Sequence, residues 1–377
     1  MSLNRRDFLS AALLGPAAFA FQSGARFIST VPLVPPGTSA PPFGRLLGDG
    51  LDARLFTDLS QLRNPQSVIR NDEFFVRTMA PKALPASWTL NVGGRVESPV
   101  GLSLQDLEAL AGPGGRYLLE CSGNSDPSNF GLLGTADWDG VPLSAVLDRA
   151  RPSAGPSRVL ISGIDDERST SRTSVPGASW IFSRDDLRGA LLATRMNGQP
   201  LPRDHGAPVR LIVPGWYGCA CIKWVDRIDV VPDEAPATTQ MQEFAARTHQ
   251  DITRLRRQEP PLARDFIPAV IDTAAMPVRV EKWIAGGRVE YRIAGIIWGG
   301  STPTNALSIR FKAGGPWTKI NDCPLPASTL TWSAWSHTWH PSAPGRYQIV
   351  LRVDDPAIRT RRLDLFFYVR EVVIDEV

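Results

Sequence analysis

The first two thirds of the chain alternate short apolar runs with polar, helix-capping stretches. Apolar runs that alternate or stay continuous over four to six positions and end near Gly or Pro predict strands; these are residues 87–92, 116–120, 158–161 and 209–213. Ser103 begins a predicted helix over residues 104–110, and a second helix is predicted over 141–149, with Pro142 near its start. Residues 51–235 are therefore expected to form a mixed α and β domain.

The last third of the chain has a different period. Short segments with period-two alternation follow one another with turn residues between them, which is typical of an immunoglobulin-like β-sandwich; they are residues 278–280, 289–295, 307–311, 332–335, 347–353 and 365–369. The polar, proline-bearing residues 236–268 are expected to form a surface linker with a helix over 240–249. The predicted fold class is α+β, with the sandwich covering residues 269–377.

The N-terminus has the pattern of an export signal. Arg5 and Arg6 precede the apolar residues 11–21, which are too few to span a membrane and are interrupted by Gly15 and Pro16. Paired arginines mark the twin-arginine route, which carries folded proteins, often with a cofactor already inserted. We expect residues 1–25 to be a twin-arginine signal peptide, residues 26–50 an extended arm, and the mature protein to be periplasmic.

Composition and charge narrow the function classes. The chain has 377 residues and a net charge of +3, with no basic stripe of the kind that nucleic-acid binding requires. No apolar stretch after the leader reaches the length of a membrane span. Four cysteines are too few to build a disulfide scaffold in a chain of this length. We expect a protein that binds no nucleic acid and whose mature chain has no membrane span.

Cys121 carries the main candidate chemistry. It leaves a predicted strand and enters a Ser-Gly-Asn turn, whose backbone N–H groups can stabilise a thiolate and admit a bulky ligand. A soft thiolate suits a transition metal, whereas the alternative is an ordinary buried cysteine. Cys219 and Cys221 are spaced unlike zinc ligands, and the four histidines do not complete a hydrolase motif. From these residues alone, both readings of Cys121 stay open.

Four sequence blocks resemble the sulfite oxidases and their molybdenum-cofactor relatives. Residues 74–77 (FFVR) look like the block that supplies an active-site arginine, and 120–124 (ECSGN) like the block whose thiolate binds molybdenum. Residues 196–210 (MNGQPLPRDHGAPVR) form a long and specific match, which continues into 213–218 and 222–224. The resemblance implies a molybdopterin-binding domain followed by a dimerisation sandwich.

The same resemblance implies a cofactor, molybdenum bound to molybdopterin, and roles for individual residues. Cys121 would be the metal ligand, and Arg77 and Trp138 would join it in the catalytic pocket. Arg210, Lys223 and His205 would hold the phosphate and pterin, as cationic groups do for anions. The complete implied cofactor set is Phe75, Arg77, Cys121, Ser122, Gly123, Asp165, Ser174, His205, Arg210, Cys221 and Lys223.

Departures from the family pattern concern the substrate pocket. Ser125, Asp126 and Ala220 occupy positions where the family carries arginines, and we find no counterpart for its pocket tyrosine or for an arginine from the C-terminal domain. A pocket with one arginine holds a small dianion less well than one with three. These departures leave the implied fold and cofactor unaffected and weaken only the inference of the substrate.

The resemblance implies a periplasmic, homodimeric molybdenum oxidoreductase that oxidises a small anionic sulfur substrate, such as sulfite, by oxo transfer. Because the sequence lacks a Cys-x-x-Cys-His haem motif, electrons would pass to a separate acceptor such as a c-type cytochrome. The alternatives are a sulfane-sulfur dehydrogenase or a sulfoxide or N-oxide reductase on the same fold. A hypothesis of another class is an exported binding protein without a cofactor.

Overall fold

The structure is a computed structural model that describes residues 25–33, 44–62, 68–126, 130–165, 171 and 174–377. The predicted signal peptide lies outside the described residues, apart from its last position. Part of the predicted arm forms strand β1 (Arg26–Val31), which pairs antiparallel with a strand of the C-terminal sandwich. Within the described residues, no helix is long and apolar enough to cross a bilayer.

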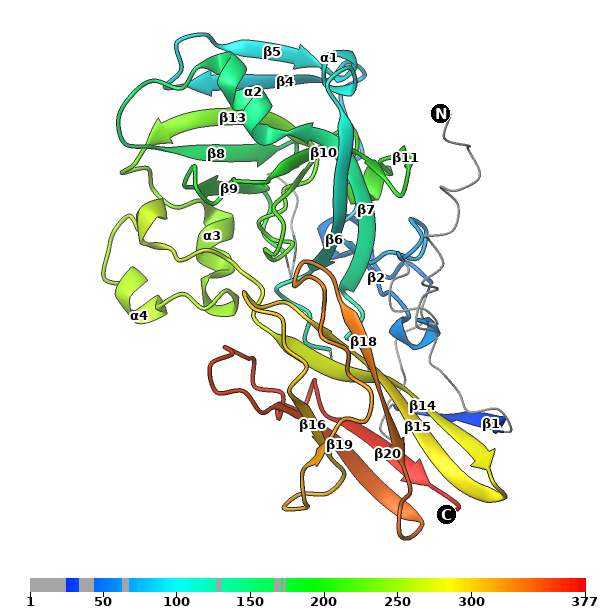
Figure 1. Ribbon diagram of the computed structural model, residues 1–377. Coiled ribbons are helices and arrows are strands. Elements are labelled where there is room, and N and C mark those ends of the chain that lie inside the picture. The colour runs from blue at the N-terminus through cyan, green and yellow to red at the C-terminus, as the bar shows by residue number, and fades with distance from the viewer. Residues whose placement is uncertain (1–24, 34–43, 63–67, 127–129, 166–170, 172–173) are drawn as a thin grey trace, which may run out of the picture.

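Two five-stranded sheets build the first domain, in the upper half of Figure 1. One sheet has the order β5 (Val100–Ser103), β4 (Thr89–Gly94), β13 (Val225–Pro232), β8 (Ser157–Gly163) and β9 (Ser179–Phe182). The other has the order β11 (Gln199–Pro200), β10 (Leu191–Met196), β7 (Leu133–Pro142) and β6 (Gly112–Glu120), with β12 (Arg210–Ile212) pairing with β10. A small ribbon of β2 (Arg54–Leu55) and β3 (Val76–Arg77) stands beside them.

Short helices connect these strands. The α-helices are α1 (Leu104–Glu108) and α2 (Leu143–Ala150), and the 3-10 turns are η1 (Gly50–Asp52), η2 (Leu59–Gln61) and η3 (Arg203–His205). The predicted start of α1 is confirmed: Ser103 and Asp106 form a reciprocal capping box, an arrangement that contributes about 1 kcal/mol. Helix α2 packs against β7 and β4, and its apolar side chains are buried there.

A sandwich of two four-stranded sheets forms the C-terminal domain, in the lower half of Figure 1. The first sheet has the order β1, β14 (Ala274–Ala285), β15 (Arg288–Trp298) and β18 (Ser333–Trp339). The second has the order β17 (Thr318–Lys319), β16 (Leu307–Arg310), β19 (Gly345–Val353) and β20 (Arg370–Ile374). All pairings within it are antiparallel, so the predicted α+β fold with a β-sandwich is confirmed.

One predicted strand of the sandwich is wrong. Residues 365–369 form a turn, and the last strand begins only at Arg370. Aromatic packing explains the difference, because Phe367 stacks on Phe130 of the first domain and Tyr368 packs against the same ring, with centroids 5.0 Å apart. These contacts across the domain boundary outweigh the β propensity of the segment.

The segment between the domains is more than a surface linker. It contains α3 (Thr239–Glu243), η4 (Ala245–Arg247), α4 (Ile252–Leu255) and η5 (Ala263–Asp265), so the helix predicted over 240–249 is present as α3 and η4. Helix α3 packs against β9. Buried apolar side chains form one continuous cluster from the first domain into the sandwich. The two domains and this segment therefore share a core.

Candidate cofactor and active site

A cavity that is open in part to solvent lies in the first domain next to the interdomain segment. Its walls come from β3, the turn after β6, residues 204–205 and 218–224, and α3. Most of the predicted cofactor residues meet there; the lining includes Phe75, Arg77, Cys121, Ser122, Asp165, Ser174, His205, Arg210, Cys221 and Lys223. Residues separated by up to 148 positions thus form one concave site, which is the form that a cofactor site takes.

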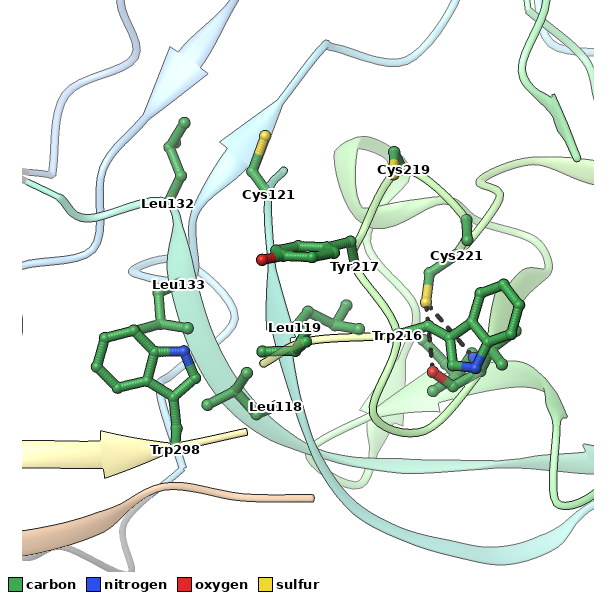
Figure 2. Close-up of a cluster of buried hydrophobic side chains, with 14 of the residues drawn as sticks. Leu118, Leu119, Cys121, Leu132, Leu133, Trp216, Tyr217, Cys219, Cys221 and Trp298 are labelled. Carbon is green, nitrogen blue, oxygen red and sulfur yellow. Dashed lines mark hydrogen bonds between the residues drawn. The ribbon is translucent and has the colours of Figure 1, made fainter. Parts of the chain in front are cut away.

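Cys121 directly follows β6, a strand whose last residues are buried. Its backbone N–H donates to Leu132 O (3.0 Å), and the backbone N–H of Gly123 donates to its Sγ (3.3 Å). Figure 2 shows the sulfur turned away from the apolar cluster of Leu118, Leu119 and neighbouring side chains. The side chain is thus fixed at the strand end with its thiol toward the cavity, as a metal ligand requires.

The residue before Cys121 is tied to the sandwich. Glu120 is buried and forms a bidentate ion pair with Arg361, at 2.7 and 2.6 Å, and Trp298 Nε1 donates to it at 2.8 Å. Arg361 and Trp298 both belong to the C-terminal domain. Paired parallel hydrogen bonds of this kind fix geometry as well as energy. The second domain therefore holds the strand end that presents the thiol.

The other two cysteines at the cavity are different in kind. Burial raises the pKa of both Cys219 and Cys221, which keeps them as thiols at neutral pH. Cys221 Sγ accepts from the backbone N–H of Val213 (3.4 Å), an interaction drawn in Figure 2. Both are free cysteines, so they form no disulfide. Cys121 differs from both in lying beside Arg77 and in accepting from the N–H of the turn that follows it.

Arg77 lies at the end of β3, close to the thiol. Its Nη1 donates to Leu51 O (2.9 Å) and to Ser174 Oγ. Burial lowers the pKa of Arg77, while the neighbouring Cys121 and Asp52 act in the opposite direction. This guanidinium stays charged at neutral pH and faces the same space as the thiol. The predicted grouping of Arg77, Cys121 and Ser174 is thus observed.

Basic groups gather around Arg210 and Lys223, which we call the anion end of the cavity; the surroundings of Cys121 and Arg77 are its thiol end. Arg210 is buried and its Nη1 donates to His205 O (3.1 Å), while its Nε has no hydrogen-bond partner among the described residues. Lys223 Nζ donates to Arg77 O (3.1 Å), Thr78 O (2.7 Å) and Asp204 O (2.8 Å). The lysine therefore also ties β3 to the turn that carries His205.

Burial disfavours the charged forms of the basic groups at this end. It lowers the pKa of Arg210 to about 10 and that of Lys223 well below its usual range, and it lowers the pKa of His205 to about 4. Buried cations without an anionic partner are costly. The unpartnered Nε of Arg210 points to a missing acceptor. A phosphate-bearing cofactor supplies such an acceptor, so the residues present fit a molybdopterin.

Two predicted residues need a different description. Trp138 is fully buried and is not among the described residues that line the cavity. Its indole N–H donates to Tyr117 O (3.3 Å), and the ring centroid lies 5.6 Å from Arg210 Cζ. The expectation of a substrate-facing tryptophan is corrected: Trp138 supports Arg210 from the core. Gly123 contributes its N–H to the thiol but does not line the cavity wall.

Sequence reasoning missed the contribution of the interdomain segment. Gln240 and Phe244 line the cavity, and Gln240 Nε2 donates to Cys219 O. Arg247 lies next to the turn that follows Cys121, since its Nη1 is 2.8 Å from the point a Cβ on Gly123 would occupy. Nothing in the polar pattern of residues 236–268 distinguishes these side chains from those of an exposed linker.

Comparisons with known proteins find a molybdopterin-binding domain in the part of the chain that contains the cavity. Residues 77–239 match the family model of the oxidoreductase molybdopterin binding domain. The chain is 28% identical to sulfite oxidase of Gallus gallus over 323 residues, which cover 76% of this chain and 66% of that protein. It is 32% identical to a nitrate reductase [NADPH] of Beauveria bassiana over 163 residues, 39% of this chain and 18% of that protein.

A solved structure has the same fold along nearly the whole chain. The crystal structure of the sulfane dehydrogenase SoxCD from Paracoccus pantotrophus matches with a TM-score of 0.62 at 18% identity, covering 98% of this chain and 95% of the matched one. The chain thus contains an oxidoreductase domain whose cofactor is molybdenum–molybdopterin. Over 76% of its length the chain is similar to a sulfite oxidase. It spans 66% or less of the length of the sulfite oxidases and nitrate reductases it matches.

Proposed function

We propose that this protein is an exported molybdenum oxidoreductase that oxidises sulfite or a related small sulfur compound. The observation that carries the proposal is the position of Cys121, a thiol held by a backbone N–H in a cavity that the buried basic groups Arg210 and Lys223 also line. A cofactor that joins a metal to a phosphate matches these two kinds of group. When bound, the molybdenum supplies two-electron oxygen-transfer chemistry.

The protein's own residues would bind and orient this group. Cys121 provides the soft ligand, and the Gly123 N–H holds its sulfur in place. Arg210 offers its unpartnered Nε to an anionic oxygen. His205, whose Nε2 is 2.8 Å from Asn71 O, is neutral at pH 7 because burial lowers its pKa to about 4. It therefore serves as a hydrogen-bonding wall of the site.

The choice of substrate follows from the pocket chemistry. Arg77 beside the thiol favours a small anion, and sulfite is the leading candidate because sulfite oxidases are among the relatives. Oxidation of sulfane sulfur is the main alternative, in view of the structural match to a sulfane dehydrogenase. With no Cys-x-x-Cys-His motif in the sequence, electrons would leave to a separate acceptor such as a c-type cytochrome. Twin-arginine export, a periplasmic location and a homodimer complete the proposal.

Replacing the thiol tests the proposal directly. In purified full-length protein, Cys121→Ser should abolish reduction of an artificial acceptor by sulfite, because a hydroxyl is a poor soft ligand. The melting temperature should be retained, since the change is isosteric. Metal analysis should find molybdenum close to equimolar in the wild type. Cys323→Ser, in the sandwich, is the matched control and should keep full activity. Turnover by Cys121→Ser, or wild-type protein without molybdenum from a competent host, would contradict the proposal.

A further inference from the structure

The long sequence block of residues 196–210 contains two residues that the cofactor site described above does not use. Asn197 and Gly198 form the two-residue loop between β10 and β11, and both have a positive φ, 53° and 72°. A hairpin loop of this length favours Asn-Gly because both residues adopt left-handed backbone angles. The loop by itself would therefore explain Asn197 without any role for its side chain.

The side chain of Asn197 nevertheless forms hydrogen bonds through both its oxygen and its nitrogen. Its Oδ1 accepts from the backbone N–H of Asp137 (2.9 Å), and its Nδ2 donates to Ile69 O (2.8 Å) and to Asn71 Oδ1 (2.8 Å). Asn71 Nδ2 in turn donates to Met196 O (3.1 Å). These bonds fix the segment that carries Asn71 against the ends of β7 and β10, which a hairpin loop alone does not require.

The backbone carbonyl of Asn71 contacts His205. His205 Nε2 lies 2.8 Å from Asn71 O. Because a carbonyl oxygen only accepts, this ring nitrogen carries the hydrogen of the bond. The Phe74 ring packs edge-to-face with the imidazole, with centroids 5.6 Å apart and planes at 83°. The orientation and the tautomer of His205 therefore both depend on the segment that Asn197 holds.

The second ring nitrogen of His205 is left to the cavity. His205 is buried and lines the cavity, and its Nδ1 has no hydrogen-bond partner among the described residues. Burial lowers the pKa of His205 to about 4, and the cations Arg210 and Lys223 add to this effect. The ring is thus neutral at pH 7, and Nδ1 is a hydrogen-bond acceptor. An acceptor in this position indicates that a bound molecule supplies the donor.

We propose that Asn197 is a positioning residue, which acts through Asn71 to present Nδ1 of His205 as a hydrogen-bond acceptor to the cofactor. The assignment rests on the proposed function, because the matching N–H or O–H donor belongs to the molybdopterin. It also gives different roles to the groups expected to hold the cofactor. An unprotonated Nδ1 does not attract a phosphate oxygen, which leaves the phosphate to Arg210 and Lys223.

The tautomer of His205 can be measured by NMR in cofactor-loaded, full-length protein with ¹⁵N-labelled histidine. In the wild type, the signals that are absent from His205→Asn should report a protonated Nε2 and an unprotonated Nδ1. Asn197→Asp replaces the amide donors by an acceptor and tolerates the left-handed backbone. It should mix the two tautomers and weaken cofactor binding about tenfold, measured as molybdenum per chain after dialysis. Asn91→Asp makes the same change at an exposed position of β4 and should alter neither quantity.

Asn197→Gly separates the role of the amide from that of the turn. Glycine adopts the left-handed loop without strain, so the hairpin folds, whereas every hydrogen bond of the side chain is lost. We expect the same changes as in Asn197→Asp, with circular dichroism confirming that both variants are folded. Wild-type His205 signals and molybdenum retention in both Asn197 variants would overturn the proposal, as would a protonated Nδ1 in the wild type.

The same measurement distinguishes a failure of this proposal from a failure of the proposed function. The hydrogen bond between His205 and Asn71 lies within the protein, so the tautomer can also be measured in the apoprotein. Wild-type protein without molybdenum, in which the Nε2–H tautomer is present and is lost in Asn197→Gly, would contradict the proposed function and support the positioning role. Molybdenum-loaded wild type with an unchanged tautomer in Asn197→Gly would overturn the positioning role alone.

Discussion

The two ends of the cavity use positive charge in different ways. At the anion end, Arg210 is buried within the first domain, with an unpartnered Nε and a backbone carbonyl as its acceptor. At the thiol end, Arg77 is partly buried at the end of a ribbon, and Arg247 is exposed on the interdomain segment. Buried cations on strands suit a resident cofactor, whereas accessible ones suit a substrate that enters and leaves. The difference indicates that one domain binds the cofactor and that several elements together select the substrate.

Contacts with the C-terminal sandwich also distinguish the thiol end from the anion end. Glu120 connects the strand before Cys121 to Arg361 and Trp298 of the sandwich. Among the described residues, Arg210 contacts His205 and Trp138, and both belong to the first domain. The sandwich therefore contributes to the active site without lining the cavity within the described residues. Three predictions test this asymmetry.

Glu120→Gln should have the largest effect. It leaves Arg361 as a buried charge without its carboxylate, which is expected to lower the free energy of unfolding by about 3–5 kcal/mol. Denaturant unfolding of the apoprotein measures it. Asp185→Asn is the control, because it breaks only an exposed ion pair with Arg188. It should lower the free energy of unfolding by less than about 1 kcal/mol.

A second variant checks the cause of that loss. Combining Glu120→Gln with Arg361→Met removes the orphaned charge, so most of the lost stability should return. Equal unfolding free energies for Glu120→Gln and Asp185→Asn would show that the thiol end does not depend on the sandwich.

Arg210→Met should act in the opposite direction on stability. The apoprotein loses a buried cation with an unsatisfied Nε, so its unfolding free energy should stay the same or rise. Cofactor affinity should fall by about 1.5–3 kcal/mol, the value of a hydrogen bond to a charged group. Molybdenum per chain after dialysis, together with apoprotein melting curves, measures both effects. Arg227→Met, on the exposed side of β13, is the control. A destabilised apoprotein with full cofactor retention would assign Arg210 a purely structural role.

The two ends also differ in how far the sequence predicted them. The anion end comes from residues 196–224, a nearly continuous stretch whose motif and strands are recognisable, so Arg210, His205 and Lys223 were all predicted near the cavity and are found there. The hydrogen bonds of Lys223 to three carbonyls were not foreseeable, because they depend on how β3 approaches.

The thiol end depends on contacts that local patterns do not encode. Arg54 faces Arg77 through a ribbon of two residues per strand, and Arg247 comes from a segment with the composition of a linker. Trp138 was predicted in the pocket from the family resemblance, yet its indole packs into the core. The turn over residues 365–369 follows from aromatic contacts across the domain boundary. Each of these outcomes is decided by tertiary packing.

Gly123→Ala should have the smallest effect and probes the thiol end alone. A Cβ at this position would lie 2.8 Å from Arg247 Nη1, closer than a real contact permits, while its 3.7 Å distance to Cys121 Sγ is an ordinary one. Because Arg247 is exposed and flexible at its tip, it can move aside, so the fold and the molybdenum content should persist. The KM for sulfite should rise about fivefold, equivalent to about 1 kcal/mol.

Gly112→Ala is the matched control for this change, since a Cβ there, at the start of the strand β6 that leads to Cys121, meets nothing within 4 Å. Both variants carry the same loss of backbone freedom in the unfolded chain. A rise in KM confined to Gly123→Ala, and reduced when it is combined with Arg247→Met, would assign the effect to the displaced guanidinium. The same rise in both variants would mean that β6 flexibility, rather than Arg247, sets substrate affinity at the thiol end.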